Sequence, residues 1–200
     1  MLLDNRGSAL LDPAHQGPTI NMTAHLIIVS GRSGSGKSSV ANEMSQQLRL
    51  RGIPHANIDG DNLDALYPEP EGSDVLLANL EAMWTTYTRT RPSMGRLIVS
   101  GTAIVLDFEE IKKIMANIGG SSDHGVEGKA VILTAGDGVA ASRLRAREVG
   151  SEFELCLASS NRMAGILEEL VGDWADRVAT DGKNVRDTAL HILRQAGWIH

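Results

Sequence analysis

The sequence lacks several features that would point to a membrane or secreted protein. It has one cysteine, Cys156, in 200 residues, which excludes an intrachain disulfide. Its longest apolar runs are only a few residues, whereas a transmembrane helix needs about 20. No basic region followed by an apolar stretch, as in a secretory signal, opens the chain. These absences predict a cytoplasmic protein with no membrane partner.

The sequence also has no excess of positive charge. The formal net charge is -6, and lysine and arginine form no continuous run. A general nucleic-acid binder usually presents a basic surface, so this composition predicts no nucleic-acid partner. The length of 200 residues suits one domain with a buried core.

The hydrophobic pattern divides the chain into a short tail and one domain. Residues 1–22 have no helical or alternating period and are interpreted as a flexible tail, and residues 23–200 as a single domain. Short apolar runs predict buried strands at 26–29, 56–58, 97–99 (with an extension to about 106), 130–133 and 177–179. Helical periodicity predicts helices at 37–50, 74–88, 108–118, 139–149, 152–171 and 185–195, with a loop at 119–128. This alternation predicts an α/β fold with a parallel sheet and helices on both faces.

One region departs from the alternation. Between residues 137 and 172 two predicted helices follow each other without an intervening strand, and Gly150 separates them. We interpret this segment as an inserted helical lid.

The strongest motif is a phosphate loop, residues 31–38, between the first strand and the first helix. Its residues are Gly31, Arg32, Ser33, Gly34, Ser35, Gly36, Lys37 and Ser38, an unbroken match to G-x-x-x-x-G-K-[ST]. The glycines let successive backbone N–H groups point at phosphate oxygens, and the helix that follows adds its positive end. Lys37, expected to face solvent when no nucleotide is bound, would reach the β- and γ-phosphates of ATP, and Ser38 would supply a hydroxyl to Mg²⁺.

Other features narrow the class of P-loop protein. The sequence has no Asn-Lys-x-Asp, which a signalling GTPase needs to select guanine. The strand at 97–99 ends in Ser100-Gly101, without the acid expected of a transporter-type ATPase. Asp107 follows an apolar run and is a weaker alternative for a magnesium-binding acid, because it also suits the start of the next helix.

Better-placed acids occur in the acidic segment, residues 58–62, which reads Ile-Asp-Gly-Asp-Asn. Asp59 and Asp61 come at the end of the second predicted strand, and the carboxyl ends of strands line the ligand crevice of such sheets. Either carboxylate would accept a proton from a substrate hydroxyl, and Asp59 would also hold the water shell of Mg²⁺ together with Ser38. The two point the same way if the segment is extended, whereas a turn at Gly60 would separate them. A plain Asp-Gly turn is the alternative.

With these two motifs the chain resembles the adenylylsulfate kinase and gluconate kinase branch of the P-loop small-molecule kinases. Adenylylsulfate kinases carry Asp-Gly-Asp-Asn, as at 59–62, and their third strand also ends in serine, as at Ser100. The resemblance extends over about residues 24–198. It implies a three-layer P-loop fold with a lid, ATP and Mg²⁺ as cofactors, and phosphoryl transfer to the hydroxyl of a small molecule. The chain departs from the family after Asn62, where Leu63-Asp64-Ala65 replaces an arginine and a substrate-gripping set, which favours another acceptor.

Arginines of the predicted lid are candidates for stabilising the transferred phosphoryl group. Arg143 and Arg147 lie four residues apart, so a helix places them on one face, where an anion between them would relieve their repulsion. Arg162, on the next helix, would face them. The alternative is a solvated helix face neutralised by Glu148 and Glu152.

The loop at 180–184 links the last strand to the last helix. The resemblance places it beside the adenine base, whereas its residues alone also suit an Asp-Gly turn followed by Asn184 as helix cap. The predicted nucleotide-binding residues are Gly31, Ser33, Gly34, Ser35, Gly36, Lys37, Ser38, Ser39, Asp181 and Asn184. A nucleotide, sugar-nucleotide or antibiotic kinase, or an ATP-binding switch without enzymatic activity, remains an alternative.

Overall fold

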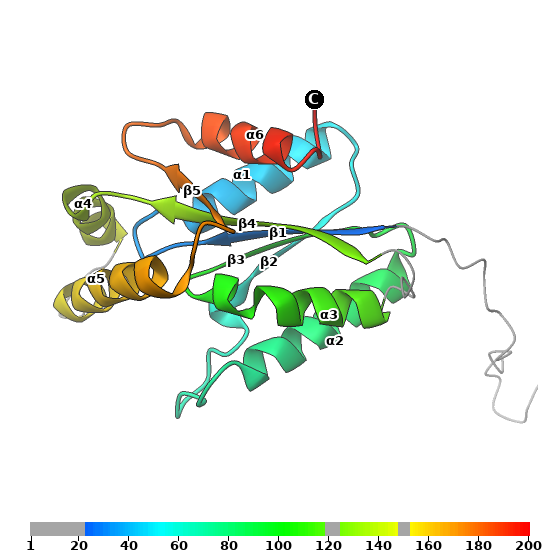
Figure 1. Cartoon of the computed structure of the whole chain (residues 1–200), viewed down its shortest axis with the longest axis horizontal. Helices are drawn as coiled ribbons and strands as arrows, with labels where there is room; N and C mark the ends of the chain where they lie inside the picture. Colours follow the sequence, from blue (N-terminus) through cyan, green and yellow to red (C-terminus); the bar gives the residue numbers. More distant parts are fainter. Residues whose placement is uncertain (1–22, 119–124, 148–152) are drawn as a thin grey trace, which may run out of the picture.

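A computed structural model describes residues 23–118, 125–147 and 153–200 (Figure 1). The predicted tail at 1–22 and the predicted break at Gly150 lie outside the described residues. None of the helices in these described ranges is long and apolar enough to cross a membrane.

The centre of the molecule is a parallel sheet of five strands in the order β2-β3-β1-β4-β5. The strands are β1 (Ala24–Ser30), β2 (Ala56–Asp59), β3 (Arg96–Gly101), β4 (Val126–Thr134) and β5 (Asp176–Ala179). Residues 26–29 of β1 are almost completely buried, because helices cover both faces of the sheet.

Helices form a layer on each side of the sheet (Figure 1). On one face lie α1 (Lys37–Leu50) and α6 (Val185–Gln195), and on the other α2 (Asp74–Thr90) and α3 (Phe108–Ile118). The two faces bury separate apolar clusters, one with Met44 and Ile192 and the other with Trp84 and Met115. The predicted three-layer α/β fold is therefore confirmed.

Two more helices, α4 (Asp137–Arg147) and α5 (Phe153–Leu170), follow each other without a strand, as the sequence predicts. They lie side by side at the end of the sheet to which β1 and β4 run (Figure 1). Short 3-10 turns, η1 (Gly60–Asn62) and η2 (Ile104–Asp107), follow β2 and β3.

Two predicted boundaries are wrong. Strand β4 begins at Val126, within the predicted loop 119–128, because it pairs with β1 from Ala24 onward. Gly128, one of the glycines that suggested a loop, leaves room in this strand for the ring of Phe108. A Cβ at Gly128 would lie 2.6 Å from the Cζ atom of Phe108. Strand β3 ends at Gly101 and does not extend to 106, since residues 104–107 turn into η2.

The sheet places the predicted motifs at one edge. Because all strands are parallel, their carboxyl ends meet there, and each is followed by a segment of interest: the phosphate loop after β1, η1 after β2 and Thr102 after β3. Helix α4 follows β4, and Thr180 follows β5. Ligands bind at this edge in open α/β sheets.

Candidate active site

The phosphate loop has the backbone of an anion cradle. Gly34 and Gly36 have φ values of 86° and 97°, which residues with a side chain rarely adopt. Among the described residues, the backbone N–H groups of Gly34 and Gly36 have no hydrogen-bond acceptor. Helix α1 begins directly after Gly36, so its positive end faces the same space. These free donors match the needs of bound phosphate.

A cavity of about 360 Å³ opens over this loop. It extends from the phosphate loop and the first turn of α1, past α4, to the start of α6. The residues that line it are Gly34, Ser35, Gly36, Lys37, Ser38, Ser39, Val40, Arg143, Leu144, Arg147, Thr180, Lys183, Val185 and Thr188.

Lys37 is buried, and the prediction that it faces solvent is wrong. Only 7% of the residue is exposed. Its Nζ atom lies 3.2 Å from Oδ2 of Asp61, so the ammonium group has a carboxylate partner inside the site. The attraction of this carboxylate offsets part of the desolvation penalty of the buried ammonium group.

Ser38 and Asp59 meet as the sequence predicts for a magnesium site. The Ser38 hydroxyl donates a hydrogen bond to Oδ2 of Asp59 at 3.2 Å. Hydroxyl and carboxylate oxygens are hard ligands of the kind that Mg²⁺ prefers, and magnesium bound beside a nucleotide usually takes only one or two carboxylates. This donor pair therefore fits the ion. Asp107, the weaker alternative, lines a different cavity.

The turn η1 separates the two acids. Oδ1 of Asp59 accepts the backbone N–H of Asp61 at 3.2 Å, which caps the turn. Asp61 consequently points toward the end of β3, where its Oδ1 accepts the N–H of Thr102 at 2.6 Å and its Oδ2 the Thr102 hydroxyl at 3.2 Å. The chain thus turns at Gly60, and each acid has a different partner in the phosphate loop.

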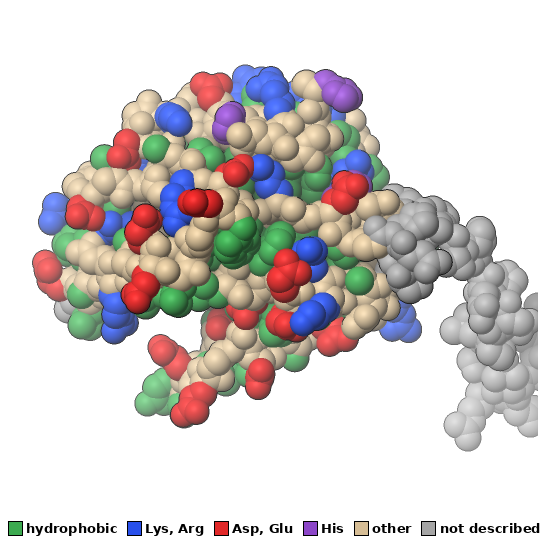
Figure 2. Space-filling view, viewed as in Figure 1, with side chains coloured by type: hydrophobic (Ala, Val, Ile, Leu, Met, Phe, Trp, Pro, Cys, Tyr) green, Lys and Arg blue, Asp and Glu red, His purple; other side chains and the backbone are tan. Residues whose placement is uncertain are grey.

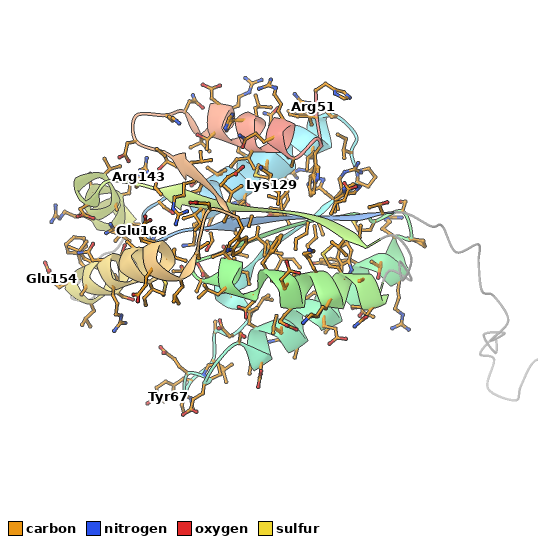
Figure 3. The ribbon with its side chains drawn as sticks, viewed as in Figure 1. Arg51, Tyr67, Lys129, Arg143, Glu154 and Glu168 are labelled. Atoms are coloured by element: carbon orange, nitrogen blue, oxygen red, sulfur yellow. The ribbon has the colours of Figure 1, made fainter. Side chains whose placement is uncertain are left out.

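Arg143 lies against the phosphate loop (Figure 3). Its Nη1 donates to the carbonyl oxygen of Gly34 at 3.2 Å and to Oγ1 of Thr180 at 2.9 Å, and its Nη2 donates to the Thr180 carbonyl at 3.1 Å. Arg147 lines the same cavity, so the two arginines share a face of α4 as predicted. Arg162 is exposed and does not line this cavity.

Arg32 is a residue that the sequence argument missed, since it occupies a variable position of the motif. It is only 5% exposed. Its Nε donates to Oγ of Ser160 at 2.9 Å, and its Nη atoms donate to Asp137 and Asn161. The phosphate loop is thereby attached to both α4 and α5.

The loop at 180–184 forms the far wall of the cavity through residues other than the predicted ones. Thr180 and Lys183 line the cavity. Asp181 accepts the N–H of Gly136 at 2.9 Å, and the Asn184 side chain caps α6 by accepting the N–H of Arg186 at 2.8 Å. Asp181 and Asn184 therefore shape the loop, and neither lines the cavity.

A second cavity, of about 440 Å³, has Asp61 in its wall, and Asp61 contacts Lys37 of the first cavity. It is bounded by η1, η2, the start of α2 and Met163 of α5. Figure 2 shows the surface hollowed between the α4–α5 end of the molecule and a projecting segment. This segment joins η1 to α2, and Tyr67, 95% exposed, lies at its tip (Figure 3).

Comparison with known families gives a match over the first part of the domain. The family described as adenylylsulphate kinase matches residues 23–69, which contain both the phosphate loop and the acidic segment. No curated protein sequence gives a significant match.

Solved structures match over most of the domain. The APS kinase of Mycobacterium tuberculosis, in complex with AMPPNP and APS, is 18% identical, with a TM-score of 0.51 over 86% of this chain and 96% of that chain. A gluconokinase from Sinorhizobium meliloti is 20% identical, with a TM-score of 0.52 over 87% and 92%. Shikimate kinase from Acinetobacter baumannii, in complex with shikimate, is 16% identical, with a TM-score of 0.52 over 88% and 93%. The chain therefore has the fold of the P-loop small-molecule kinases, and the predicted resemblance is confirmed at low identity.

Proposed function

We propose that the protein transfers the γ-phosphoryl group of ATP to a hydroxyl of a small molecule. One observation carries this proposal: two acids meet two neighbouring residues of the phosphate loop, Asp61 at Lys37 and Asp59 at Ser38. A switch that only senses ATP needs no acid poised beside the phosphate-binding lysine. The structural relatives named above are kinases for small molecules, which agrees with this assignment.

Ser38 and Asp59 would hold magnesium, Asp59 through the ion's water shell. Bound magnesium neutralises charge on the β- and γ-phosphates during transfer. The free N–H groups of Gly34 and Gly36 would bind phosphate oxygens, with Ser33, Ser35 and Ser39 beside them.

Asp61 is the better placed of the two acids to act as the acceptor base. It contacts Lys37, and it lines the second cavity, where an acceptor would lie. The N–H of Thr102 holds its Oδ1, whereas Oδ2 contacts the Thr102 hydroxyl and Lys37. Oδ2 would take the hydroxyl proton once Lys37 turns to the bound ATP. Lys37 would turn to the transferring phosphoryl group when ATP is bound, because it occupies the position of the motif whose ammonium group reaches the β- and γ-phosphates.

The arginines of α4 would divide their tasks. Arg143 donates to carbonyl groups of the loop and of Thr180, so it positions the cradle. Arg147 lines the cavity one helical turn further along and would approach the phosphates. The adenine base of ATP would lie near Thr180 and Lys183, in the loop that Asp181 and Asn184 shape.

The proposal is tested by ADP release from ATP and Mg²⁺ in the presence of a panel of hydroxylated metabolites. Lys37→Ala should lower transfer by at least about 100-fold, because the variant loses the cation that stabilises the transferring group. Lys113→Ala is the matched control, since Lys113 is an exposed residue of α3 paired with Glu110. Turnover equal to wild type in Lys37→Ala, with folding verified by denaturation, would contradict the assignment. ATP binding without transfer to any acceptor would favour a switch.

A further inference from the structure

The second cavity identifies the kind of acceptor, and this inference rests on the proposed function. All of its wall except Met163 comes from the segments at and after the ends of β2 and β3, so it opens at the same edge of the sheet as the phosphate loop. Asp61 lines the second cavity and contacts Lys37, which lines the first, so the two cavities are adjacent at this ion pair. A molecule of modest size in this cavity would have a hydroxyl beside Asp61.

The charged groups of the cavity wall are carboxylates. Asp61, Asp64 and Asp107 line it, and none of the lining residues that the structure describes is a lysine or an arginine. Asp61 already has Lys37 and Thr102 as partners. The side chains of Asp64 and Asp107 have no hydrogen bond or ion pair within the described part of the chain, and both are half-buried.

The surroundings extend this negative charge. Between Arg51 and Arg89 the sequence has acidic residues and no lysine or arginine, and this stretch includes η1, the projecting segment and the start of α2. Figure 2 shows acidic side chains on the projecting segment beside the hollow. A field of one sign around a cleft attracts ligands of the opposite charge and repels like charge. An acceptor with phosphate or carboxylate charge is therefore disfavoured.

The remaining wall combines hydroxyl and apolar groups. Ser73 and Thr102 offer hydroxyl groups, and Leu76, Ile104 and Met163 offer apolar surface. Such a wall suits a short carbon skeleton with hydroxyl groups, while two free carboxylates suit an ammonium group.

We infer that the acceptor is a small alcohol that carries a protonated amine. Asp64 and Asp107 bind the ammonium group, and Asp61 receives the proton of the hydroxyl. The hydroxyl oxygen forms a bond to the γ-phosphorus, the bond from that phosphorus to the β-bridging oxygen breaks, and ADP leaves with the electron pair. The products are ADP and a phosphorylated amino alcohol.

The experiment identifies the acceptor by separating candidate small molecules according to their charge. A protein-free extract of small molecules from the source cells is divided at neutral pH into fractions retained on a cation exchanger, retained on an anion exchanger, or not retained. Each fraction is incubated with the full chain, Mg²⁺ and ATP labelled in the γ-phosphate. Label should enter the cation-exchange fraction. Transfer only into the neutral or anionic fraction would overturn the inference and leave the proposed kinase standing. No transfer into any fraction, with ATP binding intact, would instead count against the kinase function and the inference together.

Variants then locate the ammonium site. With the labelled amino alcohol as acceptor, Asp64→Asn and Asp107→Asn should each raise its KM roughly 10- to 100-fold, since each removes a charge-assisted hydrogen bond, while the KM for ATP changes little. Glu81→Gln is the matched control, because Glu81 is an exposed acid of α2 outside the cavity wall. Acceptor KM values that are unchanged in both aspartate variants, or equally raised in the Glu81 variant, would contradict a direct ammonium site.

Discussion

Nε of Arg32 donates a hydrogen bond to Oγ of Ser160 at 2.9 Å, across 128 positions of the sequence. Ser160 in turn donates to the carbonyl oxygen of Ser33 at 2.8 Å. The phosphate loop and α5 are therefore joined by a polar network around the buried Ser160.

The first prediction concerns this network. Arg32→Ala should lower the free energy of unfolding by about 2–4 kcal/mol, because it leaves the buried Ser160 without its charged partner. Chemical denaturation measures the change. Arg49→Ala is the control, since Arg49 is an exposed residue of α1 whose side chain has a single hydrogen bond within the described ranges, to Gln46. Equal stability of the two variants would show that the network contributes nothing to folding.

The second prediction concerns the contact of the loop with α4. A Cβ at Gly34 would lie 2.6 Å from the carbonyl oxygen of Ala140, and Gly34 also has a positive φ. Gly52 has a positive φ of 65° with nothing within 4 Å, so it isolates the backbone effect. Gly52→Ala should cost about 1 kcal/mol of stability through backbone strain, and Gly34→Ala about 1–3 kcal/mol more, because the helix must move. Equal denaturation midpoints for Gly34→Ala and Gly52→Ala would contradict this close approach.

The third prediction separates the two acids. Asp61→Asn keeps an oxygen for the N–H of Thr102 and loses the base, so transfer should fall about 10²–10⁴-fold with little change in ATP affinity. Asp59→Asn should weaken the binding of ATP with Mg²⁺ together with the rate, since Asp59 contacts Ser38. Titration of a fluorescent ATP analogue with and without Mg²⁺ distinguishes these effects. If both variants bind and transfer like wild type, residues 59–61 are only a turn.

The fourth prediction concerns residues 137–172. Leu144 and two arginines of α4 line the nucleotide cavity, so an ATP analogue should slow hydrogen exchange in α4 and in α5, which is attached to the loop. Helix α3, which lies outside that cavity, serves as the internal reference. Equal exchange in α4 and α5 with and without the analogue would mean that these helices are ordinary packed elements and not a lid.

The sequence alone determined the features that depend on neighbouring residues. The phosphate loop is eight consecutive residues, and its glycines, lysine and serine have their roles through local backbone geometry. Helix α1 and helix α6 begin and end where their apolar periodicity predicts, because the residues that form an amphipathic face all lie within one short segment of the sequence. The resemblance to one branch of kinases followed from the phosphate loop and residues 59–62, which are local patterns, and the family model matches residues 23–69, which contain both.

The tertiary structure decided which side chains meet. Lys37 is buried against Asp61 only because strands β1, β3 and β2 are neighbours and η1 turns Asp61 away from Asp59. Arg143 contacts Gly34 across 109 positions, and its spacing to Arg147 predicts a shared face but not that partner. Contacts between distant segments depend on strand order and helix packing, which involve the whole chain at once, and a linear pattern of residue types does not specify them.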